Sequence, residues 1–156
     1  MKKFTLSIFI CIIIWNQGFT QSICDNKFAF GFENIFNWNI VFVSKPLENS
    51  EIRMIMFENI LTVRDRMITC EIAETEENAI EKIISSENTI VIDTIANPYG
   101  NKNTYIIIKK NNNNRMNALI DHFGYLLNVS YYDNKSVDKE KFKRLIGSYI
   151  NMKLEL

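Results

Sequence analysis

The sequence of residues 124–150, GYLLNVSYYDNKSVDKEKFKRLIGSYI, predicts a strand, a polar turn and an amphipathic helix in succession. Side chains of residues 116–132 alternate between two sides, so we expect one extended segment there. Ser136 is the expected helix cap, and the acidic Asp138 and Glu140 follow in the first turns, where the helix dipole favours them. The apolar side chains have the i, i+3, i+4, i+7, i+8 spacing of one buried face: Phe142, Leu145, Ile146, Tyr149 and Ile150. We therefore expect this helix to pack on a sheet. Its water-facing side chains should be Lys139, Lys141, Lys143 and Arg144.

A second amphipathic helix is predicted for residues 74–86. Thr75 can cap it, and Ile80 belongs to an apolar face that also contains Ala79, Ile83 and Ile84. Residues 58–66 fit either a strand or a short helix.

Further strands are indicated on both sides of that helix. The turn residues at 96–101 predict a hairpin between residues 90–95 and 105–109. The other strand candidates are residues 28–32, 38–43, 52–57 and 67–72. Because helices and strands are separated along the chain rather than alternating, we expect the α+β class, with an antiparallel sheet packed against two amphipathic helices.

The first 22 residues have the order of a cleavable signal peptide. Lys2 and Lys3 precede an apolar run over residues 4–15, and polar and small residues follow, so cleavage is expected after Thr20 or Ser22. A membrane anchor would need about 20 apolar residues, and this run is shorter. We therefore expect an exported protein, periplasmic or extracellular, that meets the membrane only through the signal before cleavage.

The mature chain, residues 23–156, has the length of a single domain. Its charges are nearly balanced, and no run of five or six like charges occurs. This composition lacks the basic surface that nucleic-acid binding requires, so we expect no nucleic-acid partner.

Two cysteines, Cys24 and Cys70, remain in the predicted mature chain. An oxidising compartment would allow them to form a disulfide. Alternatively both are unpaired thiols, with Cys70 packed as a small apolar residue in a strand.

The sequence contains a single histidine, His122, next to Asp121. An imidazole beside a carboxylate could act as a general base, but neighbouring residues of a strand point to opposite faces, so Asp121 cannot easily orient His122. No histidine or cysteine partners complete a zinc site. We therefore interpret His122 as structural or simply exposed, and we expect no catalytic residue, metal or cofactor.

An acidic cluster stands where the 67–72 strand is followed by the 74–86 helix: Glu71, Glu74, Glu76 and Glu77. Helix capping and dipole effects explain it, although a paired-carboxylate glycosidase site has the same residue type. No phosphate-binding or dinucleotide-binding motif occurs.

Aromatic residues are frequent in the first strands and again after residue 98. A β-rich core needs such side chains, so we expect most of them to be buried. Tyr99 is the exception, because it stands in the turn Asn97-Pro98-Tyr99-Gly100-Asn101, where a binding side chain would be exposed.

The strand and helix of residues 124–150, ending Leu145-Ile146-Gly147-Ser148-Tyr149, resemble the last strand and helix of PsbP-like domains and related small exported bacterial proteins. The resemblance covers the last fifth of the chain. It implies a helix lying across an antiparallel sheet and a non-catalytic binding or assembly module.

The sequence favours an exported, non-enzymatic protein-binding domain of the bacterial envelope. One variant is a periplasmic immunity protein that neutralises a toxin. The alternatives are a small secreted hydrolase that uses His122 and an envelope structural protein held by a retained signal segment.

Overall fold

The computed structural model describes residues 22–76, 78–100 and 102–151. The predicted signal peptide lies outside these residues except for Ser22. Within the described part, no helix is long and apolar enough to span a bilayer.

The described chain forms ten strands and two helices, and every paired strand is antiparallel to its neighbour. In chain order they are β1 (Ser22–Asp25), β2 (Phe30–Glu33), β3 (Asn39–Leu47), β4 (Ser50–Phe57), β5 (Arg66–Glu74), α2 (Ala79–Ile84), β6 (Thr89–Ile95), β7 (Thr104–Lys109), β8 (Asn112–His122), β9 (Tyr125–Asp133), α3 (Lys139–Gly147) and β10 (Ile150–Asn151). The large sheet has the order β3-β4-β5-β9-β8-β7-β6, and the small sheet has the order β1-β2-β10.

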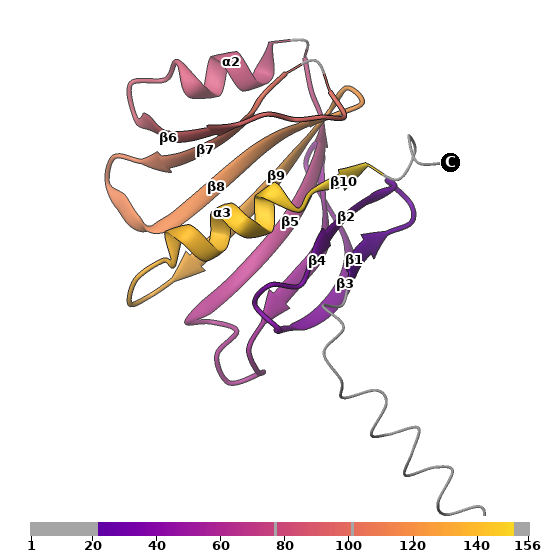
Figure 1. Cartoon of the computed structure of the whole chain (residues 1–156), viewed down its shortest axis with the longest axis vertical. Helices are drawn as coiled ribbons and strands as arrows, with labels where there is room; N and C mark the ends of the chain where they lie inside the picture. Colours follow the sequence, from indigo (N-terminus) through magenta and orange to yellow (C-terminus); the bar gives the residue numbers. More distant parts are fainter. Residues whose placement is uncertain (1–21, 77, 101, 152–156) are drawn as a thin grey trace, which may run out of the picture.

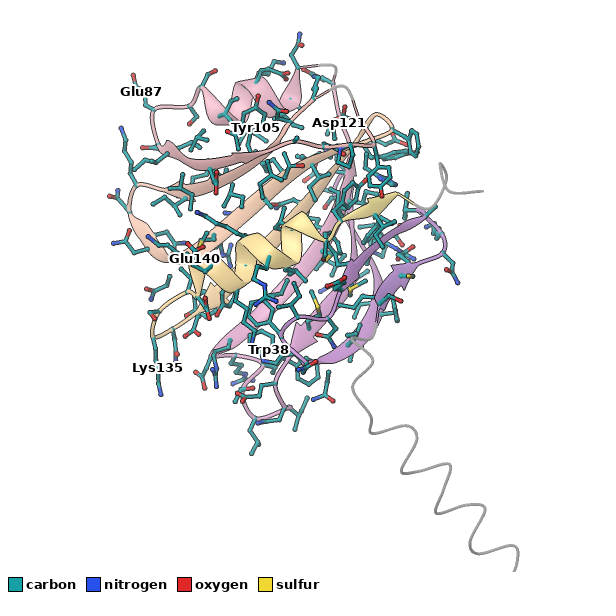
Figure 2. All side chains as sticks on the ribbon, viewed as in Figure 1. Trp38, Glu87, Tyr105, Asp121, Lys135 and Glu140 are labelled. Carbon is teal, nitrogen blue, oxygen red and sulfur yellow. The ribbon has the colours of Figure 1, made fainter. Side chains whose placement is uncertain are left out.

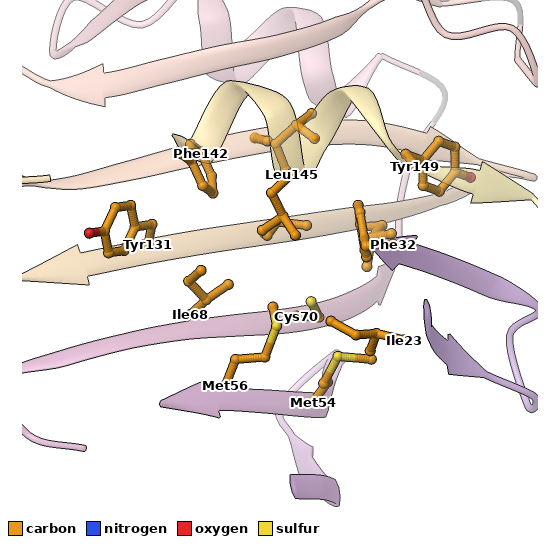
Figure 3. Close-up of a cluster of buried hydrophobic side chains, with 14 of the residues drawn as sticks. Ile23, Phe32, Met54, Met56, Ile68, Cys70, Tyr131, Phe142, Leu145 and Tyr149 are labelled. Carbon is orange, nitrogen blue, oxygen red and sulfur yellow. The ribbon is translucent and has the colours of Figure 1, made fainter. Parts of the chain in front are cut away.

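One face of the large sheet is covered by α3 and the small sheet (Figure 1). The main core lies between these layers, where Phe142 and Leu145 of α3 point toward the strands (Figure 3). Ile68 and Cys70 of β5 enter the same core from the large sheet. The sheet positions alternate between buried and partly exposed, as expected for a sheet with one covered face.

The other face of the large sheet is covered only in part, by α2. Ile80 packs there on Ile107 and Leu119, with Leu126 at the margin. The two helices therefore lie on opposite faces of one sheet (Figure 1). Antiparallel sheet and two amphipathic helices agree with the predicted class, whereas the separate three-stranded sheet was not expected.

Helix α3 buries the predicted face, since Phe142, Leu145 and Ile146 are all at most 2% exposed. Its cap differs from the prediction: the Asp138 side chain accepts a hydrogen bond from the Lys141 backbone N–H at 3.0 Å. Ser136 is not the cap because the helix begins at Lys139, and the Ser136 backbone N–H instead donates to the carboxylate of Asp133.

The end of α3 and one of its lysines also differ from the prediction. The helix ends at Gly147, so Tyr149 is buried beyond it and Ile150 belongs to β10. Lys143 does not simply face water, because its Nζ pairs with Asp93 of β6 at 2.9 Å.

The prediction of one extended segment over residues 116–132 was wrong. His122 and Tyr125 are paired across a hairpin, and Phe123 and Gly124 form its two-residue turn with φ of 51° and 82°. Positive φ at both positions is the geometry of a type I′ turn. Phenylalanine is rare at such a position, so the apolar alternation hid the turn.

Two other predictions were corrected. Helix α2 has six residues instead of thirteen, and Thr75 does not cap it but donates through its hydroxyl to the Gly124 carbonyl. Residues 58–65 are neither strand nor helix but consecutive turns between β4 and β5. The predicted hairpin of residues 90–95 and 105–109 is confirmed as β6 and β7.

Candidate functional site

His122, the one candidate general base, is a buried part of the core, with 1% of its surface exposed. Its Nε2 lies 2.5 Å from the carbonyl oxygen of Phe28, and its Nδ1 lies 2.6 Å from the hydroxyl of Tyr149. A carbonyl only accepts, so Nε2 carries the proton, and in the neutral ring the Tyr149 hydroxyl then donates to Nδ1. The ring joins β8 to the turn before β2 and to the residue before β10.

The arrangement around His122 does not provide a catalytic pair. Asp121 faces the other side of β8, where it lines a hollow beside α2, while His122 faces the core. Asp121 lies at the α2 end of the molecule, far from Trp38 at the opposite end (Figure 2). A general base must come within hydrogen-bond reach of a substrate proton, and a ring with 1% exposure is enclosed by protein instead.

A surface hollow of about 570 Å³ lies between the turn before β2, the turn between β3 and β4, and the last residues of β5. Phe28 and Tyr125 form one wall, with their rings edge to face at 5.6 Å. Its acidic members are Glu51, Glu74 and Glu76. Of the predicted acidic cluster, Glu74 and Glu76 line this hollow. Two members of the cluster are engaged by other residues: Glu71 accepts a hydrogen bond from Ser50, and Glu76 pairs with Lys82. Glu77 lies outside the described residues.

Glu51, which lines this hollow, belongs to a network of ion pairs. Arg53 is fixed by Asp25 at 2.8 Å and by Glu51 at 2.6 Å, and Lys27 reaches Glu51 at 2.9 Å. The Ser44 hydroxyl, followed by Lys27 and Arg53, lowers the pKa of Glu51 from 4.5 to about 2. The network links the turn after β1 to β3 and β4, so its first role is to join the two sheets.

The described residues contain no group of histidine, cysteine or acidic side chains arranged to hold a metal. The two cysteines among the described residues, Cys24 and Cys70, are not bonded to each other in this structure. Cys70 is fully buried, and burial raises the pKa of its thiol to about 12, with a smaller contribution from Asp25. Ile23 and Asp25 are the buried residues of β1, so Cys24 faces the other side of that strand, away from the core that contains Cys70.

Tyr99 is half-buried rather than exposed at a loop tip. Its ring packs edge to face on Tyr149 at 5.8 Å, and it lies against the main core. The turn around it is held by Asn97, whose side chain accepts from the Tyr99 backbone N–H and donates to the Asp121 carbonyl. This environment gives Tyr99 a packing role in addition to any binding role.

Exposed apolar side chains occur where the sequence pattern did not indicate a site. On β3, Val41 is 43% exposed and Phe42 is 58% exposed, and on the loop between β4 and β5, Ile60 is 71% and Leu61 is 86% exposed. Asn39 ties the two segments together, because its Nδ2 donates to the Glu58 carbonyl at 2.7 Å. The sequence signal lay in residues 58–66, which fitted either a strand or a short helix, because Ile60 and Leu61 are apolar although they do not face the core.

Comparison with protein-family models gives no match, and no curated protein sequence matches the chain. Among solved structures, the chain is similar to the solution structure of cyanobacterial PsbP (CyanoP) from Synechocystis sp. PCC 6803. The TM-score is 0.50 at 14% sequence identity, and the match covers 87% of this chain and 95% of that chain. The similarity implied by the last fifth of the sequence therefore extends over most of the molecule, and the chain has a PsbP-like fold.

Proposed function

We propose that the mature chain is an exported, non-enzymatic protein-binding domain of the bacterial envelope, and that its partner adds a strand to the open edge at β3. The observation that carries this proposal is that β3 is an edge strand of the large sheet. It is the first strand of the large sheet, and among the described strands it pairs with β4 alone. An edge strand presents unpaired backbone N–H and C=O groups, which an extended peptide can pair with.

The two halves of β3 differ in how they are protected. In the second half, the register shifts between Phe42 and Lys45, and Pro46 follows, and bulges, lysines and prolines are common devices against edge pairing. The first half, from Asn39 to Phe42, pairs regularly with β4 and exposes Val41 and Phe42. A partner strand would therefore pair along this first half.

The opposite edge of the sheet is less suited to strand addition. Strand β6 has its register shift in the middle, between Val91 and Asp93, and Asp93 is engaged by Lys143. Only short regular segments remain on either side of that shift. This contrast favours β3 as the docking edge.

The non-enzymatic part of the proposal rests on two observations. His122 is enclosed by protein, and the acidic residues Glu51 and Glu76 of the hollow are engaged in ion pairs. The PsbP-like fold is in keeping with a binding module, as the resemblance in the sequence implied. Export rests on the signal-peptide pattern of the first 22 residues.

The test is capture of a partner by the mature chain from an extract of its own cell envelope, followed by mass spectrometry. Val41→Lys should reduce capture tenfold or more, because the lysine would face the apolar side chains of an added strand. Leu47→Lys is the matched control, since Leu47 lies on the protected half of β3 with nearly the same exposure, 44% against 43%.

Urea titration of both variants confirms that they are folded at equal stability. Equal capture by Val41→Lys and Leu47→Lys would exclude strand addition at β3. If the folded wild-type chain captures no specific protein, the binding function itself is wrong.

A further inference from the structure

The loop between β4 and β5 presents two neighbouring apolar side chains to solvent. Of the large apolar side chains in the part of the chain that the structure describes, Leu61 and Ile60 are the most exposed, at 86% and 71%. Single exposed apolar residues are ordinary on protein surfaces. Two adjacent ones at the tip of a loop need a further explanation, because their exposure costs solubility without any benefit to the core.

The tip is held in one shape by hydrogen bonds within the loop. The Asn59 side chain accepts from the Leu61 backbone N–H at 2.9 Å, and the Asn59 carbonyl accepts from both the backbone N–H and the hydroxyl of Thr62 at 3.0 Å. The Thr62 hydroxyl in turn accepts from the Asn59 backbone N–H at 3.1 Å. The loop therefore exposes Ile60 and Leu61 on a preformed turn.

The far end of the loop is tied to the connection between β9 and α3. The Asp65 carbonyl accepts from the Asn134 backbone N–H at 2.8 Å, and the Asp65 carboxylate accepts from the Asn134 side chain at 2.9 Å. Asn134 follows directly after β9, which pairs with β5 in the large sheet. A loop fixed at its tip and its base loses little conformational freedom when it binds, so more of its contact energy appears as affinity.

The charges around the tip indicate what kind of surface it fits. Glu58 pairs with Arg66, and the loop adds one further cation, Arg64, and one further anion, Asp65. An apolar loop that inserts into an anionic bilayer is normally surrounded by an excess of basic residues. The balanced rim complements an uncharged apolar pocket of a protein and gives no electrostatic attraction to a membrane.

The loop also begins beside the end of β3 along which an added strand would pair. Asn39 is the first residue of β3, it pairs with Phe57, and it donates to the Glu58 carbonyl at the start of the loop. The Glu58 carbonyl is two residues before Ile60, so a partner strand that continues beyond Asn39 leaves the sheet on the side where the loop begins. The loop extends beyond the ends of β4 and β5, so the tip is accessible from that direction (Figure 1).

We propose that Ile60 and Leu61 form a preformed apolar plug that inserts into an uncharged apolar pocket of the same protein partner whose strand pairs with β3. This inference rests on the proposed function and specifies it. Strand pairing is tolerant of side-chain identity, because it uses backbone groups, whereas a plug of fixed shape selects a partner with a fitting pocket. The plug would therefore supply specificity for a partner that the edge of β3 holds.

The experiment measures the affinity of the purified partner, once captured by the wild-type chain, for variants of the full mature chain. Leu61→Ser should weaken binding tenfold or more, mainly through faster dissociation, because a buried apolar anchor is lost from the interface. Leu47→Ser makes the same substitution at an exposed leucine outside the plug and should change the affinity less than twofold. Asn59→Ala keeps both plug side chains but loosens the turn, and it should weaken binding by a smaller factor than Leu61→Ser.

The outcomes separate the plug from strand addition and from the binding function. If Leu61→Ser and Leu47→Ser bind equally well while Val41→Lys binds weakly, the plug is wrong and the β3 edge stands. If Leu61→Ser binds weakly and Val41→Lys binds normally, the plug stands without strand addition. Sedimentation of the wild-type chain with vesicles of phosphatidylglycerol and phosphatidylethanolamine should show no binding. Vesicle binding that Leu61→Ser abolishes would overturn the protein-pocket assignment, and the absence of any captured protein would overturn both proposals.

Discussion

At the scale of single residues, the sequence argued against a catalytic His122 without indicating its partners. The absence of a second histidine and the position of Asp121 on the other strand face left either a structural ring or a simply exposed one. The atoms that hold the ring belong to Phe28 and Tyr149, which are 94 and 27 residues away in the sequence. No local pattern reports contacts of that separation, so the hydrogen bonds became visible only in the folded chain.

His122→Ala should lower the free energy of unfolding by about 2–4 kcal/mol, because it removes a buried ring and two hydrogen bonds. Affinity of the folded protein for its partner should change less than twofold, since the ring is enclosed. Urea titration and a binding measurement on the same preparation check both values. A variant with full stability and a hundredfold loss of activity would contradict the structural role and would favour the hydrolase.

The cysteines give a second prediction at this scale. The native chain should react with a thiol reagent at pH 8 only through the half-buried Cys24, because the Cys70 thiol is fully buried and has a pKa of about 12. After unfolding in urea, both thiols should react. A Cys24→Ser control should show no rapid reaction until it unfolds. Protein recovered from the envelope with no reactive thiol in urea would show instead that Cys24 and Cys70 are paired.

At the scale of elements, periodic amphipathic patterns were reliable and turn positions were not. Helix α3 was predictable because its buried face repeats at helical spacing over several turns. The β8–β9 hairpin was not, because Phe123 occupies a position with φ of 51° that glycine or asparagine normally takes. The β4–β5 loop was ambiguous because Ile60 and Leu61 are apolar without being buried.

The packing of α3 leads to a prediction with a built-in control. Ile146→Asp should destabilise the domain by about 4 kcal/mol or more, because it places an uncompensated carboxylate at a position that is 2% exposed. Lys139→Ala, on the exposed side of the same helix, should change the stability by less than about 0.5 kcal/mol. Both follow from urea titration, and equal effects would mean that the buried face of α3 is wrongly assigned. Lys143 is unsuitable as the control because it pairs with Asp93.

The ion network that joins β3, β4 and the turn after β1 predicts a pH dependence. Glu51 has a pKa of about 2 in the folded chain and an ordinary value of 4.5, so its stabilising contribution is complete above pH 4.5 and is lost as the pH falls toward 2. The difference in unfolding free energy between wild type and Glu51→Gln should therefore shrink by about half or more between pH 7 and pH 3. Ser44→Ala should raise the Glu51 pKa in an NMR titration, because the Ser44 hydroxyl is the main cause of its depression. A pH-independent difference would show that the network does not hold Glu51 ionised.

At the scale of the whole molecule, the class was predictable and the layering was not. Antiparallel strands and two helices followed from periodicity alone. The placement of α2 and α3 on opposite faces depends on whether Ile107 and Leu119 or Ile106 and Ala118 face a given helix. Both sets are apolar, so the sequence cannot assign the faces. The three-stranded sheet was hidden for a similar reason, because β10 contributes only two residues and pairs with a strand that lies more than a hundred residues earlier.

The position of β1 leads to a prediction about processing of the exported chain. Ser22 begins β1 and pairs with Glu33, while Ile23 is 1% exposed in the core. Cleavage after Thr20 would leave the whole of β1 in the mature chain. Cleavage after Ser22 would place the charged terminal amino group on the buried Ile23, and burying an unpaired charge is costly. We therefore expect N-terminal sequencing of protein recovered from the cell envelope to begin at Gln21. A sequence that begins at Ile23 would show that the terminal group is accommodated at the core, and one that begins at Met1 would exclude a cleaved signal and favour the envelope protein with a retained segment.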